Sequence, residues 1–244
     1  MRQSRFSGLL FYSMVFFLIS CSGNGNETKA TNDTTMVDTS KAVAAPVVTT
    51  ITTPQNMLVV THKVANYAKW KVSYDAHDSM KLASGIHNYV IGRGLKDSNM
   101  VLVAVKVDDT AKAKAFAKDP SLKKAMQKGG VMGQPTMTLI TMVFQDTATI
   151  SSDLRSRTTF MVKDWAAWQK GFEDGKQERL DNGIVTRAYG HNSDNDKKVV
   201  LVTAIMDTAK AFAYYKSDML KKRRAATGVI GEPERFLYRV VQRY

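Results

Sequence analysis

The sequence has only one cysteine, Cys21, among its 244 residues. An intramolecular disulfide is therefore excluded, and the fold must be held together by its hydrophobic core. The sequence also lacks the paired cysteine and histidine spacing of a metal site, a nucleophile elbow and a Walker-type phosphate loop. We therefore predict no metal site, and these absences argue against a hydrolase or a nucleotide-dependent enzyme.

Acidic residues are few relative to basic ones, at 22 against 35, which gives a formal net charge of +13. The basic residues are spread along predicted helices, and their one cluster, Lys221 to Arg224, is typical of a solvated helix face. We therefore expect no nucleic-acid partner. A positive surface of this kind is better suited to the anionic head groups of a lipid bilayer.

The N-terminal apolar run, from Gly8 to Ser20, is too short to span a membrane comfortably as a helix. It follows the basic residues Arg2 and Arg5 and ends in a small residue, which is the order found in a secretory signal. The sequence therefore predicts a signal peptide over residues 1–20.

The segment Leu18-Ile19-Ser20-Cys21 resembles the lipobox of bacterial lipoproteins. In that class of protein the cysteine thiol is diacylated and becomes the new N-terminus. The resemblance implies that Cys21 is a lipid anchor and that the protein is held in the bacterial cell envelope, at the outer membrane.

Residues 22–55 have no aromatic side chain and little hydrophobic periodicity. Such a segment cannot bury enough apolar surface to order itself. We therefore expect residues 21–55 to comprise the lipid anchor and a flexible tether.

The rest of the chain contains an internal repeat. A shift of 98 residues superposes many identical residues without a gap. They include Trp70 and Trp168, Gly85 and Gly183, segments 109–113 and 207–211, and Pro135 and Pro233. So many matches in one register predict two copies of one unit, over residues 56–145 and 156–244.

Each copy has the pattern of strand, helix, strand, strand, helix and strand. In the first copy the predicted strands are 57–64, 86–92, 100–107 and 136–144, and in the second the outer two are 157–163 and 234–242. We expect Gly85 and Gly183 to end helices, and Asp109 or Thr110, Asp119 and Ser217 to begin them. This order is that of a ferredoxin-like α+β fold. Its bare sheet face would be covered by the sheet of the other copy.

The segments His62–Trp70 and Gly130–Pro135 resemble the dimeric α+β barrel superfamily that includes antibiotic-biosynthesis-monooxygenase-like proteins. The resemblance extends over nearly all of residues 57–144 and 157–243. It implies two ferredoxin-like βαββαβ repeats that form a dimeric α+β barrel within one chain, and therefore a monomer. Because the superfamily includes monooxygenases, haem-degrading enzymes, isomerases and proteins with no known reaction, it does not define an activity.

Histidines are the main candidate site residues. His62 shares strand parity with apolar residues, and His77 follows Trp70 by seven positions on the same helix face. The catalytic candidates are His62, His77 and Trp70. The ligand-binding candidates are His62, Tyr74, His87 and Tyr89. The second copy has Phe160, Gly175 and Val185 in place of the three histidines, so histidine chemistry is expected only in the first copy.

Two functions remain open at this point. One is the binding of a small apolar or aromatic molecule in the barrel, without a cofactor. The other is a cofactor-free monooxygenase or a haem-active enzyme with its site in the first copy. A histidine among apolar neighbours is more often a hydrogen-bonded core residue. A third function is that the two copies together form a structural module of a surface complex.

We predict that Cys21→Ala abolishes lipid attachment, because the thiol is the acyl acceptor. Cells grown with an alkyne-tagged fatty acid would label the unsubstituted protein but not this variant. The matched control Ser22→Ala should keep the label. Labelling of Cys21→Ala at the level of the control would contradict the prediction.

Overall fold

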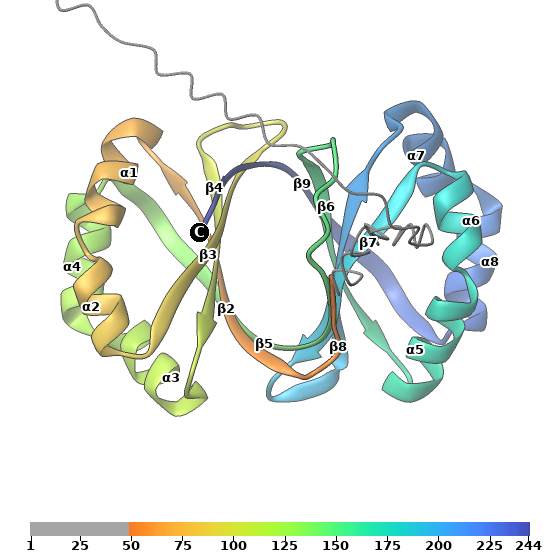
Figure 1. Ribbon diagram of the computed structural model, residues 1–244, viewed down its shortest axis with the longest axis horizontal. Coiled ribbons are helices and arrows are strands. Elements are labelled where there is room, and N and C mark those ends of the chain that lie inside the picture. The colour runs from red at the N-terminus through yellow and green to blue at the C-terminus, as the bar shows by residue number, and fades with distance from the viewer. Residues whose placement is uncertain (1–48) are drawn as a thin grey trace, which may run out of the picture. The chain divides into compact units, whose positions relative to one another are not determined.

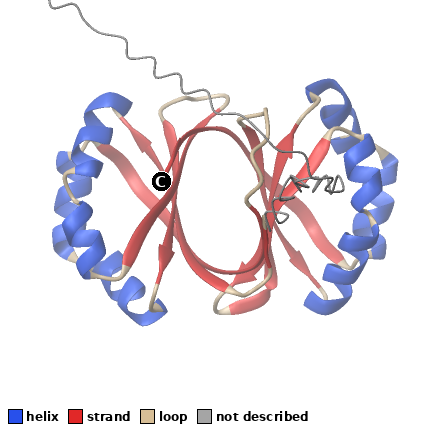
Figure 2. Ribbon diagram, viewed as in Figure 1, coloured by secondary structure: helices blue, strands red, loops and turns tan. Residues whose placement is uncertain are grey.

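A computed structural model describes residues 49–244. The predicted signal peptide and Cys21 lie outside the described residues. None of the helices in residues 49–244 combines the length and the hydropathy needed to cross a membrane. The described residues form a ring of strands with a layer of helices on each of two opposite sides (Figures 1 and 2).

The first half contains nine of the secondary-structure elements. They are β1 (Thr50–Ile51), β2 (Gln55–Val64), α1 (Tyr67–Asp75), α2 (Asp78–Ala83), β3 (Ile86–Gly94), β4 (Met100–Val107), α3 (Thr110–Lys118), α4 (Pro120–Lys128) and β5 (Val131–Asp146). The strands of this half lie in the order β5-β2-β4-β3, which is the ferredoxin-like order. β1 pairs with the end of β5, so Thr50 and Ile51, which were predicted to belong to the tether, are part of the sheet.

The second half repeats the same order without an equivalent of β1. Its elements are β6 (Leu154–Val162), α5 (Trp165–Asp174), α6 (Lys176–Asp181), β7 (Ile184–Asn192), β8 (Asn195–Ile205), α7 (Thr208–Tyr215), α8 (Asp218–Ala226) and β9 (Val229–Arg243). Its strands lie in the order β9-β6-β8-β7. The predicted α+β fold class, with two βαββαβ halves, is therefore confirmed.

Two long strands join the halves into a closed barrel. β5 pairs with β2 over most of its length and then with β7 of the other half, from Ile140 to Gln145. β9 does the same with β6 and β3. Since each half donates its last strand to the other half's sheet, the barrel has no free edge at either junction.

Alternate residues of β2 face two different cores. Leu58, Val60 and Val64 belong to the core between the sheet and helices α1–α4. Met57 and Val59 belong to a second core inside the barrel, which also receives Tyr238 from β9. This period of two places His62 on the helix side of the sheet, in line with Val60 and Val64.

The predicted helix caps are present. The Asp109 carboxylate accepts hydrogen bonds from the backbone N–H groups of Ala111 and Lys112, at 2.7 and 3.0 Å. Asp119 caps α4 with Pro120 in the first turn, and Ser217 caps α8. Gly85 and Gly183 end α2 and α6 with φ of +66° and +68°.

Two details differ from the sequence prediction. The first helix of each half is broken, at His77 and at Gly175, whose backbone N–H groups bond to the carbonyl three residues earlier instead of four. Gly130 lies in a turn as predicted, with a φ of +80°, but Val131–Pro135 is already the start of β5, because a register shift opposite Thr61 and Lys63 accommodates the irregular residues.

We predict that Gly190→Ala lowers the free energy of unfolding by about 3 kcal/mol, because the added methyl group would overpack the contact between β7 and β5. A Cβ atom at Gly190 would lie 2.1 Å from the Thr141 carbonyl oxygen of β5, across the junction of the halves. Thermal and urea unfolding would measure the change. Lys198→Ala, at an exposed position of β8, is the matched control and should unfold like the unsubstituted protein. An unchanged midpoint for Gly190→Ala would contradict the close approach.

Candidate functional site

A pocket lies between the sheet of the first half and helices α1–α4, and we call it the first pocket. Its volume is about 80 Å³, which is enough for several water molecules. Most of its lining is apolar. The side chains around it include Leu58, Val60, His62, Trp70, Tyr74, His77, Lys81, Phe116, Met126 and Met137. Four of the predicted site residues therefore meet in one place.

His62 is the unusual residue of the first pocket. Its side chain is 4% exposed, and neither ring nitrogen has a hydrogen-bond partner within residues 49–244. Burial lowers the pKa of His62 from 6.5 to about 4, so the imidazole is neutral at physiological pH. A neutral imidazole has one donor and one acceptor nitrogen, and here both are left for a ligand.

The second half shows that packing does not require the imidazole. The His62 ring lies 5.4 Å from the Trp70 ring at an interplanar angle of 56°. Phe160 lies 5.5 Å from Trp168 at 60°, in the equivalent position. Since a phenyl ring fills the same space without unpaired polar atoms, the nitrogens of His62 are costly to stability and need another explanation.

His77 lines the first pocket at the break between α1 and α2. Its Nδ1 lies 2.6 Å from the carbonyl oxygen of Ser73. A carbonyl oxygen can only accept, so Nδ1 must carry the proton and donate. In the neutral ring Nε2 is then the acceptor.

A polar network closes one side of the first pocket. The Tyr74 hydroxyl donates to Asn88 Oδ1 at 2.6 Å, and Lys81 Nζ donates to the same oxygen at 2.9 Å. Lys81 also pairs with Asp78 at 2.7 Å and lies 3.3 Å from the centre of the Tyr74 ring. These groups satisfy one another, in contrast to His62.

The buried setting changes the protonation equilibria of this network. Burial raises the pKa of Tyr74 and lowers the pKa of Lys81. The hydrogen bond from Lys81 lowers the pKa of the Asp78 carboxyl group. The phenol of Tyr74 therefore stays protonated and donates to Asn88 at physiological pH.

The sequence analysis did not identify Lys81, Asp78 or Asn88. The spacing of Asp78 and Lys81 by three residues on a short helix was a usable signal, but such pairs are common on helix surfaces. Asn88 could not have been recognised, because only the fold brings β3 against α2.

Two predicted ligand-binding residues lie outside the first pocket. His87 is exposed and pairs with Asp108 at 2.9 Å between Nε2 and Oδ2. Tyr89 lies inside the barrel, where it packs against the interior core. Asn88 points toward α1 and α2, so its neighbours in β3, His87 and Tyr89, point away from the helices and from the first pocket.

The barrel interior was the predicted place for a ligand, and most of it is packed. Met57, Val59, Leu102, Ile140, Met142, Val200 and Tyr238 form its core. A cavity of about 80 Å³ remains at one end, lined by Tyr89, Arg155, Arg187 and other residues. The predicted histidine site therefore lies between the sheet and the helices, because the side chains of β2 that carry it point outward from the barrel.

Solved structures share this arrangement. One is an anthrone oxidase-like protein, at 13% identity and a TM-score of 0.54, aligned over 79% of this chain and 94% of that one. Others are a candidate monooxygenase from Fusobacterium nucleatum (13% identity, TM-score 0.52, 78% and 93% covered) and a candidate chlorite dismutase (15%, 0.52, 78% and 96%). The chain has the dimeric α+β barrel fold. No family model and no curated protein matches the sequence.

In this dimeric α+β barrel, the two subunit-like units are the two halves of one chain. Each half covers one face of its sheet with its own helices and gives the other face to the barrel interior. The first pocket thus belongs to the first half alone, since every residue that lines it comes from β2 to β5.

We predict that His62→Phe raises the free energy of unfolding at pH 7 by about 1 to 3 kcal/mol, because two unpaired buried nitrogens are removed. The pH dependence gives a second test. The folded-state pKa of His62 is below its unfolded value, so the unfolded state binds the proton first as pH falls through 6.5. The unsubstituted protein should therefore lose about 3 kcal/mol more than the variant between pH 7 and pH 4.

Urea unfolding at several pH values would measure both effects. His87→Phe is the matched control, because that histidine is exposed and already paired. Equal pH dependence of His62→Phe and the unsubstituted protein would mean that His62 is not buried in the neutral form.

Proposed function

We propose that the protein is a lipid-anchored binding protein of the bacterial cell envelope, and that the first pocket takes up a small aromatic molecule with a hydroxyl group. The observation that carries this proposal is His62, a neutral, buried imidazole without a partner in an otherwise apolar pocket. A ligand hydroxyl that donates to His62 would satisfy the unpaired acceptor nitrogen.

The lining of the first pocket supports a ring-shaped ligand. Trp70 and Tyr74 stack with 5.1 Å between ring centres, and Phe116, Met126 and Met137 face them from α3, α4 and β5. Aromatic and thioether side chains pack well against a flat apolar molecule. Small-molecule sites commonly combine such a lining with one or two polar groups that set orientation.

A cofactor-free monooxygenase is the second candidate function. The presence of two imidazoles, His62 and His77, in one pocket favours it, because a base that removes a phenolic proton would activate the ring toward oxygen. The low pKa of His62 argues against this role, since a group that gains a proton only near pH 4 is a weak base. His62 is better suited to accept a hydrogen bond than to take a proton.

Haem fits the first pocket poorly. His62 is the buried histidine that could ligate iron, but its ring packs against Trp70 at 5.4 Å. A cavity of about 80 Å³ is far too small for a porphyrin, which would have to displace α4 and the network of Tyr74 and Lys81. We therefore assign no step to haem.

The proposed location rests on the N-terminal sequence. The lipobox-like segment at Cys21 precedes β1 by nearly thirty residues, which would let the barrel stand away from a bilayer. Cys21 acylation and a place at the outer membrane belong to this proposal, as does a monomeric state.

The experiment compares phenol with toluene, which have similar size but differ in one hydroxyl group. Isothermal titration of the full-length protein should give a Kd for phenol about tenfold lower than that for toluene, because toluene leaves His62 unpaired. In His62→Phe the preference should disappear or reverse. His87→Phe is the control and should retain the preference.

Equal affinity for the two ligands in the unsubstituted protein would contradict the proposed role of His62. Oxygen consumption with catechol, lost in His62→Phe and kept in His87→Phe, would favour the monooxygenase instead. Absence of binding by every aromatic probe would contradict both functions.

A further inference from the structure

The second half has a pocket in the place equivalent to the first pocket, and we call it the second pocket. It lies between the sheet and helices α5–α8 and has a volume of about 80 Å³. Its apolar floor consists of Phe160, Trp168, Phe172, Ile184 and Leu201. The floor therefore resembles that of the first pocket, but the rest of the lining does not.

Four arginines line the second pocket where the first pocket has other residues. With the 98-residue shift, Arg223, Arg224 and Arg235 replace Ala125, Met126 and Met137. In the same way, Arg179 replaces Lys81. At the first three of these positions the first half has neutral side chains and the second half has cations, on equivalent elements of the fold.

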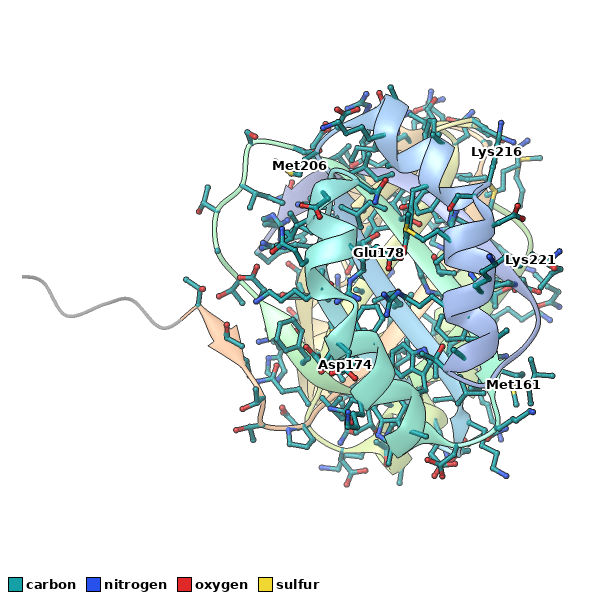
Figure 3. All side chains as sticks on the ribbon, turned by 90° about the vertical axis from the view of Figure 1, so that its right-hand side faces the viewer. Met161, Asp174, Glu178, Met206, Lys216 and Lys221 are labelled. Atoms are coloured by element: carbon teal, nitrogen blue, oxygen red, sulfur yellow. The ribbon has the colours of Figure 1, made fainter. Side chains whose placement is uncertain are left out.

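The charge of the second pocket is only partly compensated. Arg223 forms an ion pair with Glu178, which Figure 3 shows between α6 and α8 in the middle of the helical layer. Arg179 is buried and donates to the Phe172 carbonyl and to Thr186. Among the described residues, no carboxylate forms an ion pair with Arg179, Arg224 or Arg235.

Arg224 and Arg235 have no direct ion-pair partner among the described residues, although the nearby Glu232 carboxylate favours the charged form of Arg224. Burial lowers the pKa of both arginines, and the charge of Arg224 lowers the pKa of Arg235 further. Arg235 stacks on Tyr215, with 3.4 Å from its Cζ atom to the ring centre. The Tyr215 hydroxyl is itself buried and has no hydrogen-bond partner in this part of the chain. Arg235 makes one long hydrogen bond, from Nε to Thr158 Oγ1 at 3.5 Å. Its terminal guanidinium nitrogens and the Tyr215 hydroxyl group therefore remain available to an acceptor.

The backbone makes room for this arginine cluster. A Cβ atom at Gly175 would lie 2.9 Å from Nη1 of Arg223. The first half has His77 at the position of Gly175 and Ala125 at that of Arg223. A large and a small residue have therefore exchanged places across the two helices, which allows a guanidinium group to fit.

We propose that the second pocket binds a small anion, a carboxylate or phosphate group attached to an apolar or aromatic body. Arg224 and Arg235 would hold the anionic oxygens, with the Tyr215 hydroxyl as a further donor. Guanidinium groups suit this task because they donate two parallel hydrogen bonds to one oxyanion. The body of the ligand would lie on Phe160 and Trp168. This site is separate from the first pocket and does not depend on the function proposed for it.

Isothermal titration of the full-length protein with phenyl phosphate, benzoate and benzyl alcohol tests the proposal. We expect the two anions to bind more tightly than the neutral alcohol, and their affinity to fall with rising salt concentration. The stronger of the two anions identifies the oxyanion class. Equal binding of all three probes would overturn the proposal.

The substitutions Arg224→Met and Arg235→Met are suited to the test, because the first half has a methionine at each equivalent position. Each should weaken the binding of the preferred anion by about tenfold, the effect of one charge-assisted hydrogen bond. Lys222→Met, at an exposed position of α8, is the matched control and should have no such effect. His62→Phe should also leave anion binding unchanged, which separates the two pockets.

A measurement on the unsubstituted protein avoids any loss of folding in the variants. Phenylglyoxal modifies accessible arginines, and mass spectrometry of the digested protein would report the modification of Arg224 and Arg235. Phenyl phosphate should protect these two residues and not Arg239, which lies outside the second pocket. Equal modification with and without the anion would contradict the site.

Discussion

The exchange of the last strands between the halves is the constraint on which the structure depends. Each half alone would expose the inner face of its sheet, with Met57 and Val59 in the first half. By pairing with β7 and β3, the strands β5 and β9 enclose that face and fix the two sheets to each other. Both pockets lie outside this closed ring, so their linings can change without disturbing it.

Much of the fold could be predicted because local chemistry and the internal repeat agreed. Alternating apolar residues in β2, the caps at Asp109 and Ser217, and the glycines at 85 and 183 gave the correct elements. The breaks at His77 and Gly175 were missed, because they depend on whether a backbone N–H bonds three or four residues back. The hydrophobic periodicity of the sequence does not distinguish these two hydrogen-bonding patterns.

The site was only partly predictable from the sequence. Strand parity placed His62 beside Val60, and helix periodicity placed Trp70 and Tyr74 on one face, so these residues meet as expected. That side of the sheet faces the helices and not the barrel interior. This orientation depends on the tertiary structure, which strand parity does not predict. The sequence analysis interpreted Arg223 and Arg224 as part of a solvated run and did not consider Arg179 or Arg235, because only the packing of α8 against the sheet brings Arg224 and Arg235 into one pocket.

The two halves differ reciprocally at two neighbouring positions. The second half has Gly175 and Arg223 where the first half has His77 and Ala125. In a symmetric homodimer, every substitution alters two equivalent sites at once, and the sites stay identical. Here one gene encodes both halves as separate stretches, so each position is free to vary independently of its counterpart. A barrel made of two halves of one chain can therefore carry a different pocket lining in each half, apolar with one buried histidine in the first and rich in arginine in the second.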